Sequence, residues 1–384
     1  MEKLKRMLKK LGLEKGLVFV TFGNSINSVI GSLFWLAMAS VLTANDYGKT
    51  NYLLSISTLL SVISLLGLNT AVTTFTAKGN ERLRIQANSV VMSINLPLAI
   101  LLFFFLNNLS TSLLLIGLSS YTMFWAEILG RKDYKKYAFI VISQRSLQVM
   151  LSLALYMILG IDGLILGFAI SALVFSYPFF ASIKNLRFDL SEIRQKISFI
   201  SHSYSLTLSN SLTLYLDKIL IGSLFGLTLL GHYQISFQFL LVLSIIPLSM
   251  FQFLLPREAS AVSTGRPVYL GLAVAAISCS LFEFIIPSII PVLFPNFSVS
   301  VLSTKIMILG VMPMTVSSIL ASRLLGTERT KPVIVSSAVY VGVLVPLLFI
   351  LGFIFGLIGL SIAVVVSLFV RTMVLLLMTR FHAG

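Results

Sequence analysis

The chain has 384 residues, of which 57% are hydrophobic and only 11% are charged, and its mean hydropathy is +0.99. A soluble globular domain carries roughly 25% charged residues, so this composition excludes an ordinary water-soluble protein. Repeated apolar stretches of about 20 residues, each long enough to cross ~30 Å of hydrocarbon, indicate an integral membrane protein. The chain lacks the alternating ten-residue pattern of a membrane barrel, which favours helices. The single cysteine excludes an internal disulfide.

The apolar pattern predicts an all-α integral membrane protein with about twelve transmembrane helices. We expect the spans at 15–42, 51–77, 85–106, 109–129, 136–159, 161–182, 199–224, 230–255, 268–292, 299–322, 332–355 and 358–379. The opening segment, 1–14, is basic and amphipathic, which is typical of a lead-in that lies on an anionic membrane surface.

The basic residues between the spans predict the orientation of the protein. The net charge is +15, and nearly all Lys and Arg residues outside the spans fall at the two termini or in the loops on the same side. The loops on the opposite side hold only Lys49. This asymmetry follows the positive-inside rule, so we expect both termini in the cytoplasm of a cell that carries the protein in its plasma or inner membrane. The same placement argues against nucleic acid as a partner.

A long polar stretch near the midpoint divides the chain into two similar halves. We predict an N-terminal six-helix bundle at 15–182, a cytoplasmic linker at 183–198 and a C-terminal six-helix bundle at 199–384. Two halves of six spans each insert with the same orientation, as parallel repeats about an axis along the membrane normal. Transporters built this way bind substrate between the halves and alternate access by rocking them.

The two halves share short sequence signatures in the same order. Asn27 precedes Gly48 by 21 residues in the first half, and Asn210 precedes Gly231 by the same distance in the second. The turn between the fifth and sixth spans of each half is also glycine-rich: these turns are 160–164, GIDGL, and 356–360, GLIGL. Glycine is expected where closely spaced helices reverse direction, so the order of the matches is the evidence for a repeat.

The segment Leu42–Gly48, LTANDYG, resembles the first loop of the polysaccharide-biosynthesis flippases, a family of the multidrug/oligosaccharidyl-lipid/polysaccharide exporter superfamily. The segment Asp217–Gly222, DKILIG, with Gly231–Tyr233 and Leu255–Pro256 after it, resembles the seventh and eighth helices of the same family. The resemblance implies a MATE-like, V-shaped fold of two six-helix bundles. The chain lacks the two extra helices of the lipid II branch, which argues against that branch.

The resemblance also implies a function in cell-surface polysaccharide or glycan assembly. A flippase of this family translocates a polyprenyl-diphosphate-linked oligosaccharide from the cytoplasmic to the outer leaflet. The implied partners are this lipid-linked substrate, the membrane lipids, and the glycosyltransferases and polymerase of the same pathway. The resemblance implies no cofactor.

The few polar and ionisable residues inside the spans are the candidates for binding substrate. A charge near the bilayer centre costs at least ~2.5–3.5 kcal/mol, so it normally faces a cavity or a partner. The candidates are Arg145, Arg371, Lys218, Lys305, Asp217, Asn27 and Asn210. The four cations among them, set against Asp217 and Glu283, leave a formal charge of +2, about the opposite of a diphosphate. Arginine suits phosphate because its fork donates two parallel hydrogen bonds.

Each candidate also has a structural interpretation. Lys218 and Lys305 lie ~10 Å from the outer ends of their helices and can snorkel to the surface. The asparagines can join helix to helix instead of binding sugar hydroxyls. Asp217 and Lys218 are adjacent, so on a helix their side chains should diverge by ~100°, and we do not expect them to pair with each other.

Two other classes of function compete with the flippase. An ion-coupled multidrug or small-solute antiporter needs a membrane acid, and Glu283 or Asp217 is the candidate. A membrane glycosyltransferase or polymerase needs a large outer loop with catalytic carboxylates, whereas the expected outer loops are short. The segment Thr43–Thr50 ends like a phosphate-binding loop but lacks its first glycine. The histidines have no metal-ligand spacing, so we predict no metal site. Because the expected outer loops are short, we also predict that the protein is not an enzyme.

Overall fold

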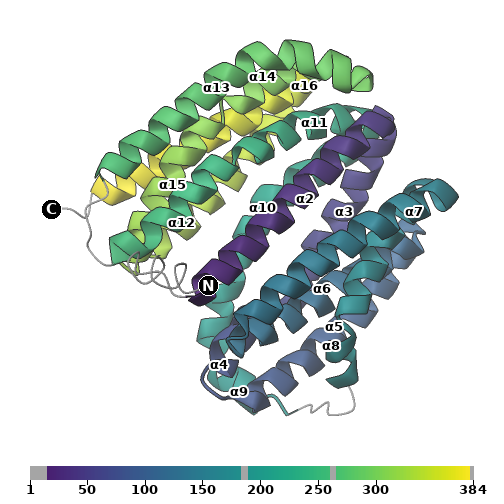
Figure 1. Ribbon diagram of the computed structural model, residues 1–384, viewed down its shortest axis with the longest axis vertical. Helices are drawn as coiled ribbons and strands as arrows, with labels where there is room; N and C mark the ends of the chain where they lie inside the picture. Colours follow the sequence, from purple (N-terminus) through teal and green to yellow (C-terminus); the bar gives the residue numbers. More distant parts are fainter. Residues whose placement is uncertain (1–14, 183–188, 260–264, 381–384) are drawn as a thin grey trace, which may run out of the picture. The chain divides into compact units, whose positions relative to one another are not determined.

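The computed structural model describes residues 15–182, 189–259 and 265–380 (Figure 1). The regular elements of this part of the chain are helices, and it contains no strand. The predicted basic lead-in at 1–14 lies outside the described residues, as does 183–188 of the predicted linker. The described remainder of that linker holds one short helix, α9 (Ser191–Gln195).

The helices pack into two compact units. The first unit comprises the described chain up to Phe34 together with Leu53–Leu208. The second unit comprises Trp35–Tyr52 and the described chain from Ser209 onward. Three long helices therefore contribute residues to both units. These are α2 (Lys15–Val41), α3 (Ala44–Leu65) and α10 (Ile197–Leu224).

In the first unit, α6 is the central helix. It packs against α4, α5 and α7, and its Met123 and Ala126 are buried in the core cluster of the unit. The described helices that lie wholly in this unit are α4 (Leu68–Thr76), α5 (Glu81–Leu106), α6 (Leu109–Gly130), α7 (Tyr134–Phe175), α8 (Tyr177–Ala181) and α9.

In the second unit, α12 lies beside α15, and α15 packs in turn against α16 (Figure 1). A second group forms where α14 packs against α11, α13 and α16. The elements of this unit are α11 (Leu227–Leu243), α12 (Ile245–Ala259), α13 (Gly265–Leu293), η2 (Pro295–Ser300), α14 (Val301–Ile308), α15 (Val311–Gly326) and α16 (Lys331–Arg380).

Two of the long helices are hairpins that reverse at a glycine. α7 leaves helical geometry at Gly160, where φ is 63°, and α16 does so at Gly356, where φ is 53°. A Cβ placed on Gly163 would lie 2.0 Å from the carbonyl oxygen of Leu155, and one on Gly359 would lie 1.9 Å from that of Leu351. Each arm therefore returns along the arm before it. The glycine-rich turns predicted in both halves are confirmed.

The number of membrane crossings follows from these hairpins. Among the described residues, 8 helices are long and apolar enough to span a membrane, or 9 when α3 and α4, bent by 53°, count as one span. Counting both arms of α7 and of α16, and adding the 28-residue α10, brings the described chain to the predicted twelve. The fold class is therefore an all-α, twelve-helix membrane protein.

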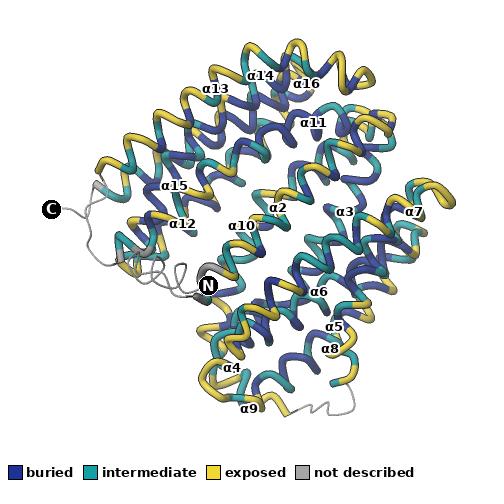
Figure 2. The backbone as a smooth tube through the Cα atoms, viewed as in Figure 1, coloured by how far each residue is buried: buried dark blue, intermediate teal, exposed yellow. Residues whose placement is uncertain are grey.

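Figure 2 shows exposed residues along the helices, and many of these exposed positions carry large apolar side chains, unlike the surface of a water-soluble protein. Phe105, Met157 and Phe284 are more than three-quarters exposed, at 80%, 86% and 82%. Small polar side chains such as Ser57 and Ser119 are completely buried between helices. Hydrocarbon solvates the exposed aromatic and aliphatic side chains, and small residues let membrane helices approach closely. The chain is a multi-pass membrane protein.

The second span starts earlier than the sequence analysis predicted. We expected it to begin at residue 51, after an outer loop, but α3 begins at Ala44. The reason is a local cap: the Thr43 hydroxyl accepts the backbone N–H of Asp46 at 3.1 Å and donates to the Asp46 carboxylate at 2.8 Å. A Thr followed three residues later by an acid is a helix-start signature, and it was readable in the sequence.

Candidate functional site

Each unit contains one cluster of polar side chains built around an arginine inside a membrane helix. In the first unit this arginine is Arg145 of α7. The Asp133 side chain caps α7 by accepting the backbone N–H of Lys136 at 3.1 Å, which fixes the start of the helix at Tyr134. Arg145 follows about eleven residues later, or ~16 Å along the helix.

The Arg145 cluster consists of Arg145, Asn27 and Gln148. The Arg145 Nε donates to Asn27 Oδ1 at 2.8 Å, and its Nη1 donates to Gln148 Oε1 at 3.1 Å. Gly31 lies one turn after Asn27 on α2, and a Cβ there would lie 3.4 Å from the Arg145 Cζ. The missing side chain leaves room for the guanidinium. Two residues predicted separately as candidates, Asn27 and Arg145, are thus direct partners.

A layer of uncharged polar groups adjoins this cluster. Gln144 Nε2 donates to the Ser171 hydroxyl at 3.2 Å, and the Tyr137 hydroxyl donates to Asn24 Oδ1 at 2.9 Å. Other buried groups have no hydrogen-bond partner within the described ranges, among them Gln148 Nε2 and the Tyr121 hydroxyl. Buried polar groups are normally paired, so unused donors inside a membrane helix bundle indicate capacity for water or a polar ligand.

In the second unit, Lys218 binds the carboxylate of its neighbour Asp217. Its Nζ lies 3.1 Å from Asp217 Oδ1 and 3.2 Å from Oδ2, and both residues are buried. The expectation that these two side chains would not pair is wrong. The lysine stem is long and flexible, so it bends back along α10 to the carboxylate and to the Leu214 carbonyl.

Aromatic side chains from α11 complete this ion pair. The Tyr233 hydroxyl donates to Asp217 Oδ2. The ring of Phe237 lies below the ammonium, with the Lys218 Nζ 3.7 Å from its centroid. A cation close to an aromatic face gains stabilisation that is strongest when water is excluded. The two charges are therefore held by their ion pair, by hydrogen bonds and by a cation–π contact, and both side chains are buried away from lipid.

Arg371, on the second arm of α16, lies in the same polar region. Tyr340, on the first arm, interacts electrostatically with both Arg371 and Asp217. The Arg371 Nε is buried and has no hydrogen-bond partner in the described part of the chain. We call Arg371, Tyr340, Asp217, Lys218 and Tyr233 the Arg371 cluster.

The other predicted residues lie outside both clusters. Lys305 of α14 forms an ion pair with Glu283 of α13 at 3.2 Å, and their side chains are 35% and 27% exposed. Asn210 is exposed on α10, and its side chain makes no hydrogen bond with another described residue. The structure therefore brings together five of the candidates, Arg145 with Asn27 and Arg371 with Asp217 and Lys218.

The ion pairs account for the charge surplus noted in the sequence. Each of the two acids is engaged by a lysine, Asp217 by Lys218 and Glu283 by Lys305. The other two cationic candidates are Arg145 and Arg371, one in each unit. Both are arginines, the side chain that binds phosphate through two parallel donors.

The glycines of the predicted repeat touch each other within the second unit. A Cβ placed on Gly48 would lie 1.8 Å from the Leu227 carbonyl oxygen and 2.8 Å from the Gly231 amide nitrogen. A Cβ on Gly231 would lie 1.8 Å from the Ala44 carbonyl oxygen. The backbones of α3 and α11 are in direct contact here, and only glycine permits that approach.

Sequence reasoning missed several members of the two clusters. Gln148 follows Arg145 by three residues on the same helix, a spacing that places their side chains side by side and was readable. Tyr233, Phe237 and Tyr340 come from other helices than the residues they contact. Their roles depend on tertiary packing and leave no local signal.

Comparison with known proteins places the fold and the family. Residues 13–261 match the model of a family described as polysaccharide biosynthesis protein. The search of curated proteins gives no match. The chain is similar in structure to a lipid II flippase, MurJ, in an inward closed conformation, with a TM-score of 0.76 and 15% identity over 94% of this chain and 87% of that one.

Two transporter structures of the MOP superfamily are also similar. One is an inward-facing multidrug resistance MATE family transporter, with a TM-score of 0.68 and 13% identity over 96% of this chain and 98% of that one. The other is an outward-facing MATE family transporter, with a TM-score of 0.65 and 12% identity over 96% and 95%. At these identities the similarity concerns the fold.

Proposed function

The chain belongs to the polysaccharide biosynthesis protein family, and from this premise we propose that it is a flippase for a polyprenyl-diphosphate-linked oligosaccharide. It carries this lipid from the cytoplasmic to the outer leaflet, for assembly of a cell-surface polysaccharide or glycan. Two six-helix bundles alternate access to the substrate. The loop charges support a plasma or inner membrane location with both termini in the cytoplasm.

The observation that carries the proposal is the buried Nε of Arg371. A buried donor without an acceptor costs about 1–3 kcal/mol, and more when the group is charged. The neighbouring carboxylate, Asp217, is already bound by Lys218 and Tyr233. A phosphate oxygen supplies the missing acceptor, so the site favours an anionic head group over a neutral or cationic solute.

Arg145 supplies the second positive charge. Asn27 and Gln148 orient its guanidinium through hydrogen bonds to their uncharged amide oxygens. Their remaining amide groups, together with Asn210, are the proposed contacts for sugar hydroxyls. Each unit thus has an arginine suited to binding phosphate, and we propose a lipid diphosphate as the cargo.

The structure favours the flippase over the ion-coupled antiporter. Coupling to protons or sodium needs a carboxylate that is open to the ion, and the proposed acids are Asp217 and Glu283. Both are in contact with a lysine ammonium. The chain's proposed role as a transporter and not an enzyme is supported by its similarity in fold to a flippase and to multidrug transporters.

The proposal is tested with purified protein in liposomes that contain a fluorescent polyprenyl-diphosphate oligosaccharide. A membrane-impermeant quencher then reports how fast the lipid changes leaflet. Arg145→Gln and Arg371→Gln should each slow transfer by about tenfold or more, the effect of losing ~1.4 kcal/mol of interaction. Together they should abolish it. Arg82→Gln, an exposed arginine at the start of α5, is the matched control and should not change the rate.

Transfer at the wild-type rate in a correctly folded Arg145→Gln/Arg371→Gln double variant would refute the proposal. Exchange of a small cationic drug for protons or sodium in the same liposomes, with no lipid transfer, would instead establish the antiporter.

A further inference from the structure

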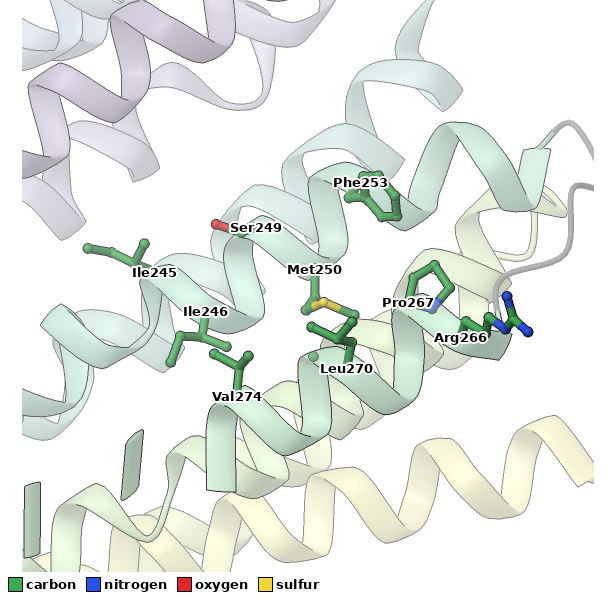
Figure 3. A pocket seen from close by; sticks show the side chains of 10 residues that line it. Ile245, Ile246, Ser249, Met250, Phe253, Arg266, Pro267, Leu270 and Val274 are labelled. Atoms are coloured by element: carbon green, nitrogen blue, oxygen red, sulfur yellow. The ribbon is translucent and has the colours of Figure 1, made fainter. Parts of the chain in front are cut away.

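An apolar groove runs between α12 and α13 on the second unit (Figure 3). Its volume is about 570 Å³, within the ~300–1,000 Å³ range of small-molecule sites. The lining is almost entirely aliphatic and aromatic, and Ser249 is its one uncharged polar residue. The apolar side chains that define it are Ile245, Met250, Phe253, Leu270 and Val274.

One end of the groove is cationic. Figure 3 shows Arg266 at this end and Ile245 and Val274 at the other. Arg266 is exposed and forms no ion pair with another described residue. A second guanidinium, that of Arg257, lies 4.0 Å from the ring centroid of Phe253, which lines the groove. Arg257 and Arg266 both flank the connection from α12 to α13, so the two charges share one end.

The groove extends along about two turns of α13. Arg266 and Val274 are eight residues apart on α13, which is ~12 Å of helix. At the floor, a Cβ on Gly271 would lie 2.2 Å from the Met250 Sδ, so α12 and α13 touch there.

We propose that this groove binds the isoprenoid chain of the phosphorylated polyprenyl carrier at an entry position, with its phosphate at Arg266 before the head group reaches Arg145 or Arg371. This inference rests on the proposed flippase function and names a contact for the part of the substrate that stays in the bilayer. Hydrocarbon in the groove buries the exposed faces of Leu270 and Val274, which are 67% and 42% exposed. The guanidinium at its end binds the phosphate through charge-assisted hydrogen bonds.

The experiment uses the full chain in phosphatidylcholine nanodiscs and a polyprenyl phosphate that carries a photoreactive diazirine in its first isoprene units. After irradiation, mass spectrometry maps the labelled peptides. We expect label on α12 and α13, reduced about tenfold by Arg266→Gln through the lost hydrogen bonds to phosphate. Val274→Trp, which fills the groove, should reduce it similarly. Leu101→Trp, at a lipid-facing position of α5, is the matched control and should leave it unchanged.

Two results would overturn the inference. One is label spread evenly over α5 and the other exposed helices. The other is displacement of the label by excess phosphatidylglycerol as effectively as by excess polyprenyl phosphate, which would make the groove a site for bulk lipid. If Val274→Trp does not fold, Val274→Phe tests the same point with a smaller side chain.

The labelling and transfer assays together distinguish a failure of the groove proposal from a failure of the flippase proposal. A wild-type protein that transfers the lipid diphosphate but shows no label in the groove contradicts the groove alone. Specific label in the groove of a protein that transfers no lipid contradicts the flippase alone.

Discussion

The Arg145 and Arg371 clusters keep a cation inside a membrane helix in different ways. Arg145 donates to uncharged amides from two helices, so its guanidinium is held in place by hydrogen bonds. Around Arg371, the other charges are already paired and the arginine Nε has no acceptor among the described residues. The first cluster is organised by its own hydrogen bonds, whereas the second contains a buried arginine N–H that has no acceptor among the described residues.

The different surroundings of the two arginines predict different contributions to folding stability and to ligand binding. Hydrogen bonds to a charged group stabilise by about 1.5–3 kcal/mol, so Arg145 contributes to the fold as well as to a ligand site. A buried donor without an acceptor is a cost, and a protein retains such a group where binding uses it. The comparison can be tested by removing one charge at a time.

The largest effect is expected from Asp217→Asn. This change leaves the Lys218 ammonium buried without its counter-charge, which costs about 3–5 kcal/mol of folding free energy. The measurement is unfolding of the purified protein in mixed detergent micelles. The control is Asp217→Asn combined with Lys218→Met, which removes both charges and should recover most of the loss. A single variant as stable as the wild type would show that the pair is not buried.

The next largest effect is expected from Arg371→Met and Arg145→Met, which should change the free energy of unfolding in opposite directions. Arg371→Met removes a buried N–H donor that has no acceptor among the described residues, and should raise the free energy of unfolding by about 1–3 kcal/mol. Arg145→Met takes the donors away from Asn27 and Gln148 and should lower it by a similar amount. The same unfolding assay measures both, and each variant serves as the control for the other. Equal shifts in one direction would remove the distinction between the clusters.

The smallest effect is expected from Glu283→Gln. Its partner is Lys305, and the pair is partly exposed, so breaking it should cost at most about 0.2–1 kcal/mol. The comparison with Asp217→Asn tests whether burial decides how much an ion pair contributes to the free energy of unfolding. A loss as large as that of Asp217→Asn would mean that this pair is shielded in the membrane.

The candidate site was partly predictable from sequence. Arg145, Asn27, Asp217, Lys218 and Arg371 were identified because a polar or charged group inside an apolar span is rare and costly. Which of them meet was not predictable, since Asn27 and Arg145 are 118 residues apart. The prediction that Asp217 and Lys218 do not pair was wrong. It assumed that both side chains keep the directions in which they leave the helix, whereas the long Lys218 side chain bends back to the carboxylate.

The sequence alone determined that the chain lies in a membrane, how many times it crosses, and where two of its hairpins reverse. Those properties are local: hydrophobic length sets a span, and a positive φ at Gly160 or Gly356 needs only glycine. Tertiary structure alone decided which charges pair, that Gly48 and Gly231 touch, and that α12 and α13 leave a groove. These features depend on atoms from segments far apart in the chain, and their positions follow only from the packing of the helices.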